Sequence, residues 1–418
     1  MKSGLWILVV VIIAGIVVGS ILKGRLDQIP DEGEWLRYRE ISDISDPDQR
    51  IAEFRKFIAE NPPSGPRQSA YNAIASDMVG TIKDTTAFER FAHEALATET
   101  DPDSRAVLYY WLYQVRSDSA SVEALARELL KDGKAASWIY NAISWDLAER
   151  VSNFRTALSL CDRAIELATT RRDSASYIDT KGWIYFKHGS YAQAVEYLDQ
   201  AVALLEEPEE EILRHLAYAA LRLNDDEKAF ETFKTILILG EYGYARAAVD
   251  SLMTLRGYTP EQRKSFNDAL WQARLASAKP AQAFTLPMLT GGTYEFKPPL
   301  EDVTIINFFA PGCRPCLAEL PQLQSLHEKF DDLGVDILVI DATNSRERME
   351  EIAREKSLTL RILLDDKQIA DKGYNLMATP TTLVVDRGGR IIFKHVGFNP
   401  DMEEMLTNEI QELLKLPT

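Results

Sequence analysis

The chain has 418 residues, of which 46% are hydrophobic and 27% are charged, and its formal net charge at pH 7 is −17. This length and apolar content suit two or three globular domains. The acidic balance, with no cluster of Lys and Arg, argues against a nucleic-acid partner, because phosphate binding relies on clustered positive charge.

The first predicted element is an N-terminal apolar segment, residues 5–22. Its sequence, LWILVVVIIAGIVVGSIL, has 18 residues without a charge, and a helix of that length rises about 1.5 Å per residue and can span a bilayer core. A cleaved signal peptide is the alternative, but its apolar region has about 7 to 15 residues, and no A-x-A cleavage site follows here. We therefore expect residues 1–4 to form a tail, residues 5–22 a retained transmembrane anchor and residues 23–33 a juxtamembrane linker.

Two signals bear on the orientation of this anchor, and they oppose each other. Positive residues lie mostly after the segment: Lys2 precedes it, whereas Lys23, Arg25, Arg37 and Arg39 follow. This count favours a cytosolic location for the bulk of the chain, whereas the short N-terminal tail favours export, and large domains translocate largely regardless of charge. We expect a single-pass protein of the cell membrane with its soluble domains on the exoplasmic (periplasmic) side, and cytosolic placement is the alternative.

The region from residue 34 to residue 277 is predicted to be helical and repetitive. Breaker clusters recur roughly every 35 residues, as NPPSGP at 61, ETDPDS at 99 and KDGKAAS at 131. Further on, ALSLCDRAIEL, AVEYLDQAVAL and AFETFKTILIL begin at residues 157, 194 and 229 and superpose with apolar residues on one face. This spacing predicts helical hairpins stacked as an all-α solenoid.

One of these units resembles a tetratricopeptide repeat. The small and aromatic residues that carry the resemblance are Gly182, Tyr185, Gly189, Tyr191, Ala194, Leu198 and Ala201. Arrays of this type present a concave surface to a protein partner, so partner binding is one function for the region and a bare structural spacer is the other. Cys161 occupies the position of Leu198 in its own unit, and we expect it to be a buried small hydrophobic residue.

Residues 278–418 are predicted to form an α/β domain. The runs VTIINFF, VDILVID, TTLVVD and RIIFKHV are typical of strands, and the tight turn DRGGR joins the last two. Helices are predicted from Cys316 to Phe330, over SRERMEEIAREK, and after Pro400 and Asp401. The order of these elements predicts a mixed sheet covered by helices.

Two of the three cysteines of the chain, Cys313 and Cys316, form a CRPC motif directly after the first of these strands. Three cysteines cannot build a structural disulfide framework, so a close pair points to redox or metal chemistry. At the start of a helix the backbone N–H groups favour a thiolate on Cys313, which can attack a disulfide, while Cys316 one turn away can resolve the product. Pro315 suits the first helical turn, and the charge of Arg314 favours the thiolate.

Zinc binding is the other use of a CxxC pair. A structural zinc site needs about four ligands, and the sequence has no second CxxC and no His pair near the first. His327 and His395 are isolated, and we expect both to be structural. No metal and no other cofactor is therefore expected.

The C-terminal domain resembles the TlpA/ResA-like membrane-associated thioredoxin family. The resemblance rests on the CxxC after a strand, on MATPTTLVVD and on the lead-in PAQAFTLPMLTGGTYEF. It implies a thioredoxin-like fold, thiol-disulfide oxidoreductase activity and a cis-proline, Pro380 after Thr379, beside the disulfide. We place four residues on the substrate-binding surface: Arg314, Pro315, Thr379 and Pro380.

Glu319 stands three residues after Cys316 and matches the glutamate of the CxxCxxE pattern in that family. The resemblance implies that it accepts the proton of Cys316, whereas spacing alone favours a solvated carboxylate. Asn307 stands where ordinary thioredoxins have a buried Asp. The sequence departs from the family at Phe309 and Gly312, where Trp is usual, and this puts the substrate contacts in doubt. A peroxiredoxin is set aside because Ala310 replaces its Thr.

The sequence therefore predicts a membrane-anchored thiol-disulfide oxidoreductase that reduces disulfides of exported proteins, with repeats that recruit a substrate or partner. Exoplasmic placement requires a separate membrane electron donor or acceptor for the CxxC pair. The alternative is a redox-silent scaffold that binds partner proteins. The direction of electron flow stays open, because potentials in this fold range from about −270 to about −120 mV.

Overall fold

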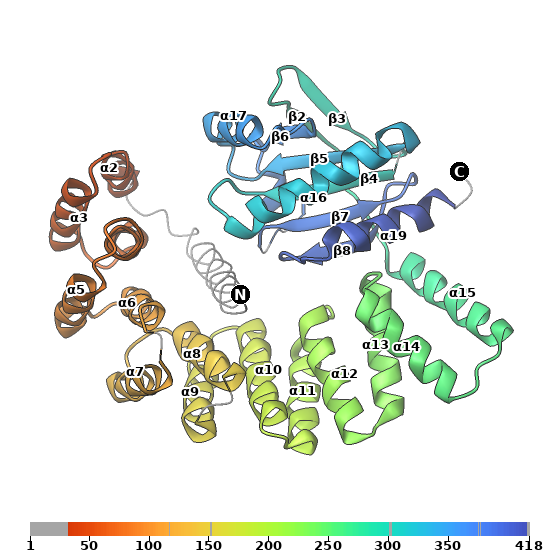
Figure 1. Cartoon of the computed structure of the whole chain (residues 1–418). Helices are drawn as coiled ribbons and strands as arrows, with labels where there is room; N and C mark the ends of the chain where they lie inside the picture. Colours follow the sequence, from red (N-terminus) through yellow and green to blue (C-terminus); the bar gives the residue numbers. More distant parts are fainter. Residues whose placement is uncertain are drawn as a thin grey trace. The chain divides into compact units, whose positions relative to one another are not determined.

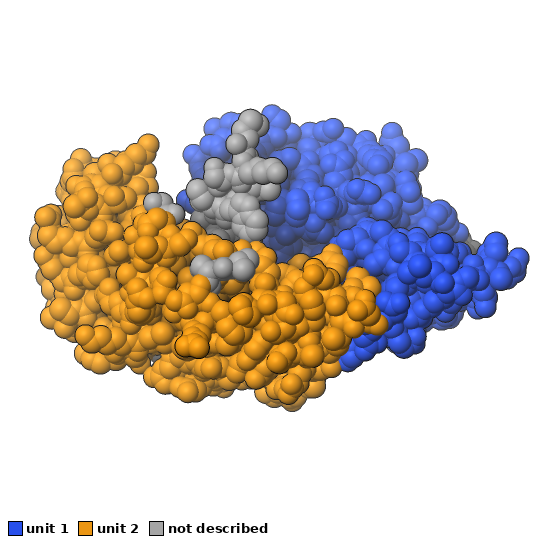
Figure 2. Space-filling model, turned by 60° about the horizontal axis from the view of Figure 1, so that its bottom comes forward, with its two compact units in different colours: residues 1–20, 225–418 blue, residues 21–224 orange. Residues whose placement is uncertain are grey.

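The computed structural model describes residues 32–116, 118–150, 153–300, 303–374, 376 and 378–415. The chain divides into two compact units, coloured differently in Figure 2, one ending at Asn224 and the other beginning at Asp225. The predicted anchor at residues 5–22 lies outside the described residues, as do the tail and most of the linker. None of the helices in the described part is long and apolar enough to cross a bilayer.

The first unit is built of helices (Figure 1). In chain order they are α2 (Glu32–Ser42), α3 (Pro47–Glu60), α4 (Gly65–Ala75), the π-helical turn η1 (Ser76–Thr81), α5 (Thr85–Thr98), α6 (Pro102–Gln114), α7 (Ser119–Asp132), α8 (Ser137–Glu149), α9 (Phe154–Glu166), α10 (Arg171–Lys187), α11 (Tyr191–Leu204) and α12 (Glu210–Leu223). The predicted breaker clusters separate α3 from α4, α5 from α6 and α7 from α8. Two of them also supply N-caps, because Ser64 and Asp101 accept hydrogen bonds from the first turns of α4 and α6. The predicted helical N-terminal region is confirmed.

Consecutive helices of this unit pack against each other, as α8 does on α9 and α10 on α11. Gly182 permits the close approach of α10 and α11, since a Cβ atom there would lie 2.6 Å from Cγ of Leu198. Cys161 is fully buried, as predicted, and burial raises the pKa of its thiol to about 12. The tetratricopeptide assignment itself stays a prediction.

The second unit begins with three helices and continues into the α/β domain. The helices are α13 (Asp226–Leu239), α14 (Gly243–Leu255) and α15 (Pro260–Ser277). The α/β domain contains β1 (Lys279–Pro280), β2 (Phe284–Pro287), β3 (Thr293–Phe296), β4 (Val303–Phe309), α16 (Arg314–Phe330), the 3₁₀ turn η2 (Asp331–Leu333), β5 (Val335–Asp341), α17 (Arg346–Glu355), β6 (Arg361–Leu364), α18 (Ile369–Lys372), β7 (Thr381–Val385), β8 (Arg390–Val396) and α19 (Met402–Leu414). The four strands and three helices predicted from sequence are all present, so the α/β domain is confirmed.

The main sheet has six strands in the order β1-β8-β7-β4-β5-β6, and β2 and β3 form a separate hairpin. The central strand β4 runs parallel to β5 and antiparallel to β7. Ile305 and Phe309 of β4 belong to the core that includes α16 and α19, whereas Ile306 and Phe308 belong to the core on the opposite face. Because strand residues alternate between faces, Asn307 shares the face of Ile305 and lies under the helices.

Helices α13 to α15 belong to the same unit as the sheet, because α13 and α15 pack on β8 and α14 packs on α13. The rings of Trp271 in α15 and Phe393 in β8 stack at 6.1 Å, and the guanidinium of Arg274 lies 5.2 and 4.8 Å from their centroids. The last helix before the sheet ends at Ser277 and the first strand begins at Lys279. The compact unit that contains the sheet nevertheless begins earlier in the chain, at Asp225.

Candidate active site

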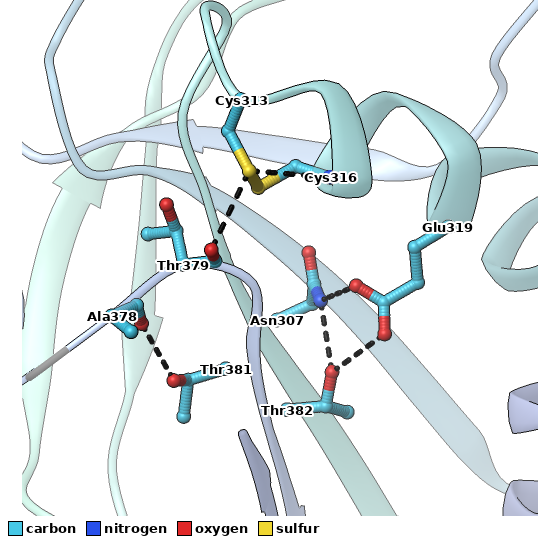
Figure 3. Close-up of a disulfide and its surroundings, with 8 residues drawn as sticks. All are labelled: Asn307, Cys313, Cys316, Glu319, Ala378, Thr379, Thr381 and Thr382. Atoms are coloured by element: carbon cyan, nitrogen blue, oxygen red, sulfur yellow. Dashed lines mark hydrogen bonds between the residues drawn. A yellow bond between two sulfur atoms is a disulfide. The ribbon is translucent and has the colours of Figure 1, made fainter. Parts of the chain in front are cut away.

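Cys313 and Cys316 form a disulfide at the start of α16, with their Cα atoms 5.2 Å apart (Figure 3). Strand β4 ends at Phe309, and the next residues turn the chain so that Cys313 becomes the N-cap of the helix. Cys316 is only 1% exposed, whereas Cys313 is half-buried. A substrate can therefore reach the sulfur of Cys313 and not that of Cys316.

The helix start supplies the positive electrostatic environment that a thiolate needs. The backbone N–H of Cys316 donates a hydrogen bond of 3.2 Å to Sγ of Cys313, at the positive end of the α16 dipole. Pro315 stands in the first helical turn and is buried, where its missing N–H leaves no donor unpaired. Arg314 is exposed, so water and salt screen its charge and the backbone contributes more to the thiolate than this side chain does.

The loop before β7 forms the other side of the disulfide. The peptide bond between Thr379 and Pro380 is cis, and the carbonyl oxygen of Thr379 lies 3.4 Å from Sγ of Cys313 (Figure 3). The carbonyl oxygen of Pro380 accepts a hydrogen bond from the N–H of Gly397, which fixes the loop to the end of β8. The structure thus brings the predicted residues Thr379 and Pro380 next to the CxxC pair.

Glu319 is buried one turn after Cys316, on the side of α16 that faces the sheet, and only 1% of it is exposed. The side-chain amide of Asn307 donates to Oε2 of Glu319 at 3.0 Å, and the hydroxyl of Thr382 donates to Oε1 at 3.3 Å. Burial raises the pKa of Glu319 to about 7, although these two hydrogen bonds and the charge of His395 oppose the rise. A solvated carboxylate is therefore the wrong interpretation of Glu319, which can gain and lose a proton near neutral pH.

Asn307 and Thr382 complete this site, and neither was among the site residues predicted from sequence. The amide group of Asn307 also donates to the Thr382 hydroxyl at 2.9 Å, so the three side chains form one network (Figure 3). The other end of Asn307, Oδ1, is buried and has no hydrogen-bond partner within the described part of the chain. In Figure 3 this oxygen lies on the side of the Asn307 amide that is nearer to the disulfide. The sequence signal that could have identified Asn307 is its place as an amide residue inside the largely apolar run VTIINFF.

Comparison with known proteins places this site in a family. Residues 278–394 match the model of the AhpC/TSA family. Thioredoxin-like protein YneN of Bacillus subtilis (strain 168) is 32% identical over 130 residues, which is 30% of this chain and 76% of that protein. Thiol-disulfide oxidoreductase ResA of Bacillus thuringiensis subsp. konkukian (strain 97-27) is 24% identical over 144 residues, or 34% of this chain and 80% of that protein.

Among solved structures, StoA from Bacillus subtilis is 26% identical and covers 29% of this chain and 95% of its own, with a TM-score of 0.27. The matched range, residues 278–394, includes the disulfide and the buried carboxyl group of Glu319. Through its C-terminal domain, the chain belongs to the thioredoxin-like thiol-disulfide oxidoreductases.

Proposed function

We propose that the protein reduces disulfides of exported proteins through the Cys313–Cys316 pair, with Glu319 as the proton acceptor for Cys316. The observation that carries this proposal is the buried carboxyl group of Glu319, one helical turn from Cys316, with a pKa raised by burial to about 7. Such a group can take a proton from a thiol and return it within the physiological pH range.

The reaction begins with the reduced protein. The Cys313 thiolate attacks one sulfur of the substrate disulfide, and the substrate S–S bond breaks. One substrate sulfur becomes bonded to Cys313, while the other leaves as a thiolate. The N–H of Cys316 and the helix dipole favour the attacking thiolate, and the Thr379–Pro380 loop beside it offers a surface for the substrate backbone.

The second step releases the substrate. The thiol of Cys316 passes its proton to Glu319 and attacks Sγ of Cys313, so the mixed disulfide breaks and the second substrate sulfur leaves as a thiolate. The Cys313–Cys316 disulfide forms, and two electrons have moved from the protein to the substrate. Burial of Cys316 keeps this thiol away from other oxidants until the mixed disulfide presents a sulfur beside it.

The rest of the chain suits a protein that works at a membrane surface. In this proposal residues 5–22 anchor the chain, the soluble parts face the exoplasmic side, and the helical region recruits the substrate or a partner. A separate membrane electron donor returns two electrons to the disulfide after each turnover, and the proton held by Glu319 returns to Cys316, so the Cys313 thiolate and the Cys316 thiol are restored. The length and apolarity of residues 5–22 support the anchor.

Trapping of the mixed disulfide tests the assigned roles. The full chain carrying Cys316→Ser is expected to accumulate a covalent adduct with oxidised insulin as the probe, because the resolving thiol is missing. Cys313→Ser is expected to abolish both the adduct and the turnover. Mass spectrometry of the products identifies the bonded cysteine.

The matched control is Cys161→Ser, which changes the third cysteine of the chain, a fully buried one. This variant should keep the turnover of the unmodified protein. Full turnover in Cys313→Ser would remove the catalytic assignment of Cys313.

A further inference from the structure

A row of polar side chains crosses the sheet beneath α16 and α19. Asn307 of β4 pairs with Thr382 of β7, and Thr382 pairs with His395 of β8. Cross-strand partners point to the same face, and the three residues are 1%, 1% and 3% exposed. Apolar residues such as Val384 and Phe393 cover the rest of this face. Buried polar groups in such a setting are costly unless they are paired, so the row requires an explanation.

Two buried carboxyl groups cover the row from above. Glu319 of α16 lies over Asn307 and Thr382, as described for the active site. Glu409 of α19 is 0% exposed, and its Oε2 lies 2.9 Å from Nε2 of His395. The row therefore has a carboxyl group at each end, and only the first of them has a role in the reaction proposed above.

The His395 ring is also held by the segment between α13 and α14. The hydroxyl of Tyr242 lies 3.2 Å from Nδ1 of His395, and the backbone N–H of Glu241 donates to Oε1 of Glu409 at 3.0 Å. A Cβ atom on Gly240 would lie 2.7 Å from Cε1 of the His395 ring, so the absence of a side chain permits this approach. His395, which the sequence suggested to be isolated, is fixed by groups from two other elements.

Within the row, the imidazole of His395 is the cross-strand neighbour of Thr382, and titratable groups from several elements surround it. The titratable and charged groups that face it are Glu319 from α16, Glu409 from α19, Tyr242 and Glu241 from the α13–α14 connection, and Arg274 from α15. Glu241 pairs with Arg274 at 2.5 Å and with Arg246 of α14 at 3.0 Å, so one carboxylate is shared by two guanidinium groups. Nε2 of His395 and Oε2 of Glu409 lie within ion-pair distance of each other.

We propose that His395 and Glu409 are positioning residues for the reaction, in which the protonated imidazole stabilises the carboxylate form of Glu319 and so promotes proton removal from Cys316. The proton moves only from Cys316 to Glu319. This inference rests on the proposed role of Glu319. Thr382 connects the two groups, because its hydroxyl donates to Oε1 of Glu319 and its cross-strand partner is His395. Without the imidazole charge we expect the titration midpoint of Glu319 to rise by about half to one pH unit.

The test follows the second step of the reaction in the full chain. Reduced protein reacts with 5,5′-dithiobis(2-nitrobenzoate), whose first coloured thiolate leaves when Cys313 attacks and whose second leaves when Cys316 resolves the mixed disulfide. The rate of the second release between pH 5 and 9 should rise through one midpoint, set by Glu319. In His395→Gln we expect that midpoint to move up by about half to one pH unit, which makes the release about three- to tenfold slower at pH 6 and leaves the plateau at high pH unchanged.

Two further variants separate positioning from packing. Glu409→Gln removes the partner that keeps the imidazole charged, and it should move the midpoint in the same direction. Glu404→Gln is the matched control, because this glutamate is exposed on the same helix, and it should leave the midpoint unchanged. In a Glu319→Gln background the midpoint should be missing, and adding His395→Gln should change nothing further.

The contradicting results are distinct for each proposal. An unchanged midpoint in His395→Gln and Glu409→Gln, or a lower rate by the same factor at every pH, would overturn the positioning role. Should His395→Gln fail to fold, Tyr242→Phe replaces it, because this variant keeps the imidazole of His395 and removes one of its hydrogen bonds. An upward shift of the midpoint in Tyr242→Phe supports the positioning role. An unchanged midpoint in both Tyr242→Phe and Glu409→Gln overturns it. A midpoint that persists in Glu319→Gln would instead overturn the proton-acceptor role in the proposed function.

Discussion

Glu319 illustrates how burial converts an ordinary carboxyl group into one that titrates near neutrality. Its spacing from Cys316 predicts only that the two residues share a helical face, and the structure adds that this face is turned toward the sheet. Removal from water disfavours the carboxylate, and the hydrogen bonds from Asn307 and Thr382 recover only part of that cost. The result is a pKa raised from 4.5 to about 7.

This shift makes a prediction about stability. A carboxyl group with a raised pKa binds its proton more tightly in the folded state, so its contribution to stability is fully present below about pH 4.5 and is lost as the pH rises through about 7. The free energy of unfolding of the oxidised protein should therefore fall by about 2 to 3 kcal/mol between pH 5 and 8 relative to that of Glu319→Gln. Urea denaturation of both proteins at the two pH values measures this difference.

The control is again Glu404→Gln, whose exposed carboxyl group should leave the pH dependence as it is in the unmodified protein. Parallel pH profiles for the unmodified protein and Glu319→Gln would mean that the carboxyl group titrates at its ordinary value and that the site has no proton acceptor in the neutral range.

At the scale of elements, much of the α/β domain could be predicted from sequence. β4, β5 and β8 coincide with VTIINFF, VDILVID and RIIFKHV because continuous or alternating apolar runs are typical of buried strands. β6, RILL, was missed because four residues give too little pattern. The segment that forms the β2–β3 hairpin was noted in the sequence only for its resemblance to the TlpA/ResA-like family, and no hairpin was predicted there.

The packing of α13 and α15 on β8 could not be predicted, because its contacts are between residues that are far apart in the sequence. Glu241 and Glu409 are separated by 168 positions, and Tyr242 and His395 by 153. No local pattern of apolar residues specifies such a contact. For the same reason the sequence showed His395 as isolated, although it is part of a buried network.

Gly240 gives a test of this packing. Its φ of −173° is extended and open to any residue, so only the close approach to His395 restricts it. Gly240→Ala would place a Cβ atom 2.7 Å from the imidazole and 2.8 Å from the Tyr242 ring. We expect this variant to lower the free energy of unfolding of the second unit by about 1 to 3 kcal/mol, as overpacking does, measured by chemical denaturation.

Gly243→Ala is the matched control, since a Cβ atom there meets no other atom within 4 Å. It should leave stability within about 0.5 kcal/mol of the unmodified protein. Equal stability of the two variants would show that the segment between α13 and α14 does not press against β8.

At the scale of the whole molecule, the chain forms two compact units, and the redox site lies entirely within the one that begins at Asp225. The site needs the strand β4, the helix α16 and the loop before β7 for its cysteines and carboxyl group, and it receives Tyr242 and Glu241 from the preceding helical segment. The sequence identified the cysteines and Glu319 by motif. It did not identify the partners of Glu319, because no local pattern shows that Asn307 of β4 and Thr382 of β7 face the same carboxyl group.

The most direct test of the central claim is a redox titration of the full chain. The protein is equilibrated at a series of buffer potentials, and its thiols are alkylated and located by mass. We predict a reversible two-electron transition assigned to Cys313 and Cys316, with Cys161 unmodified in the folded protein because it is fully buried. A midpoint nearer about −270 mV than about −120 mV supports the reducing direction. A folded protein in which the pair shows no transition would contradict the oxidoreductase mechanism and favour a redox-silent scaffold.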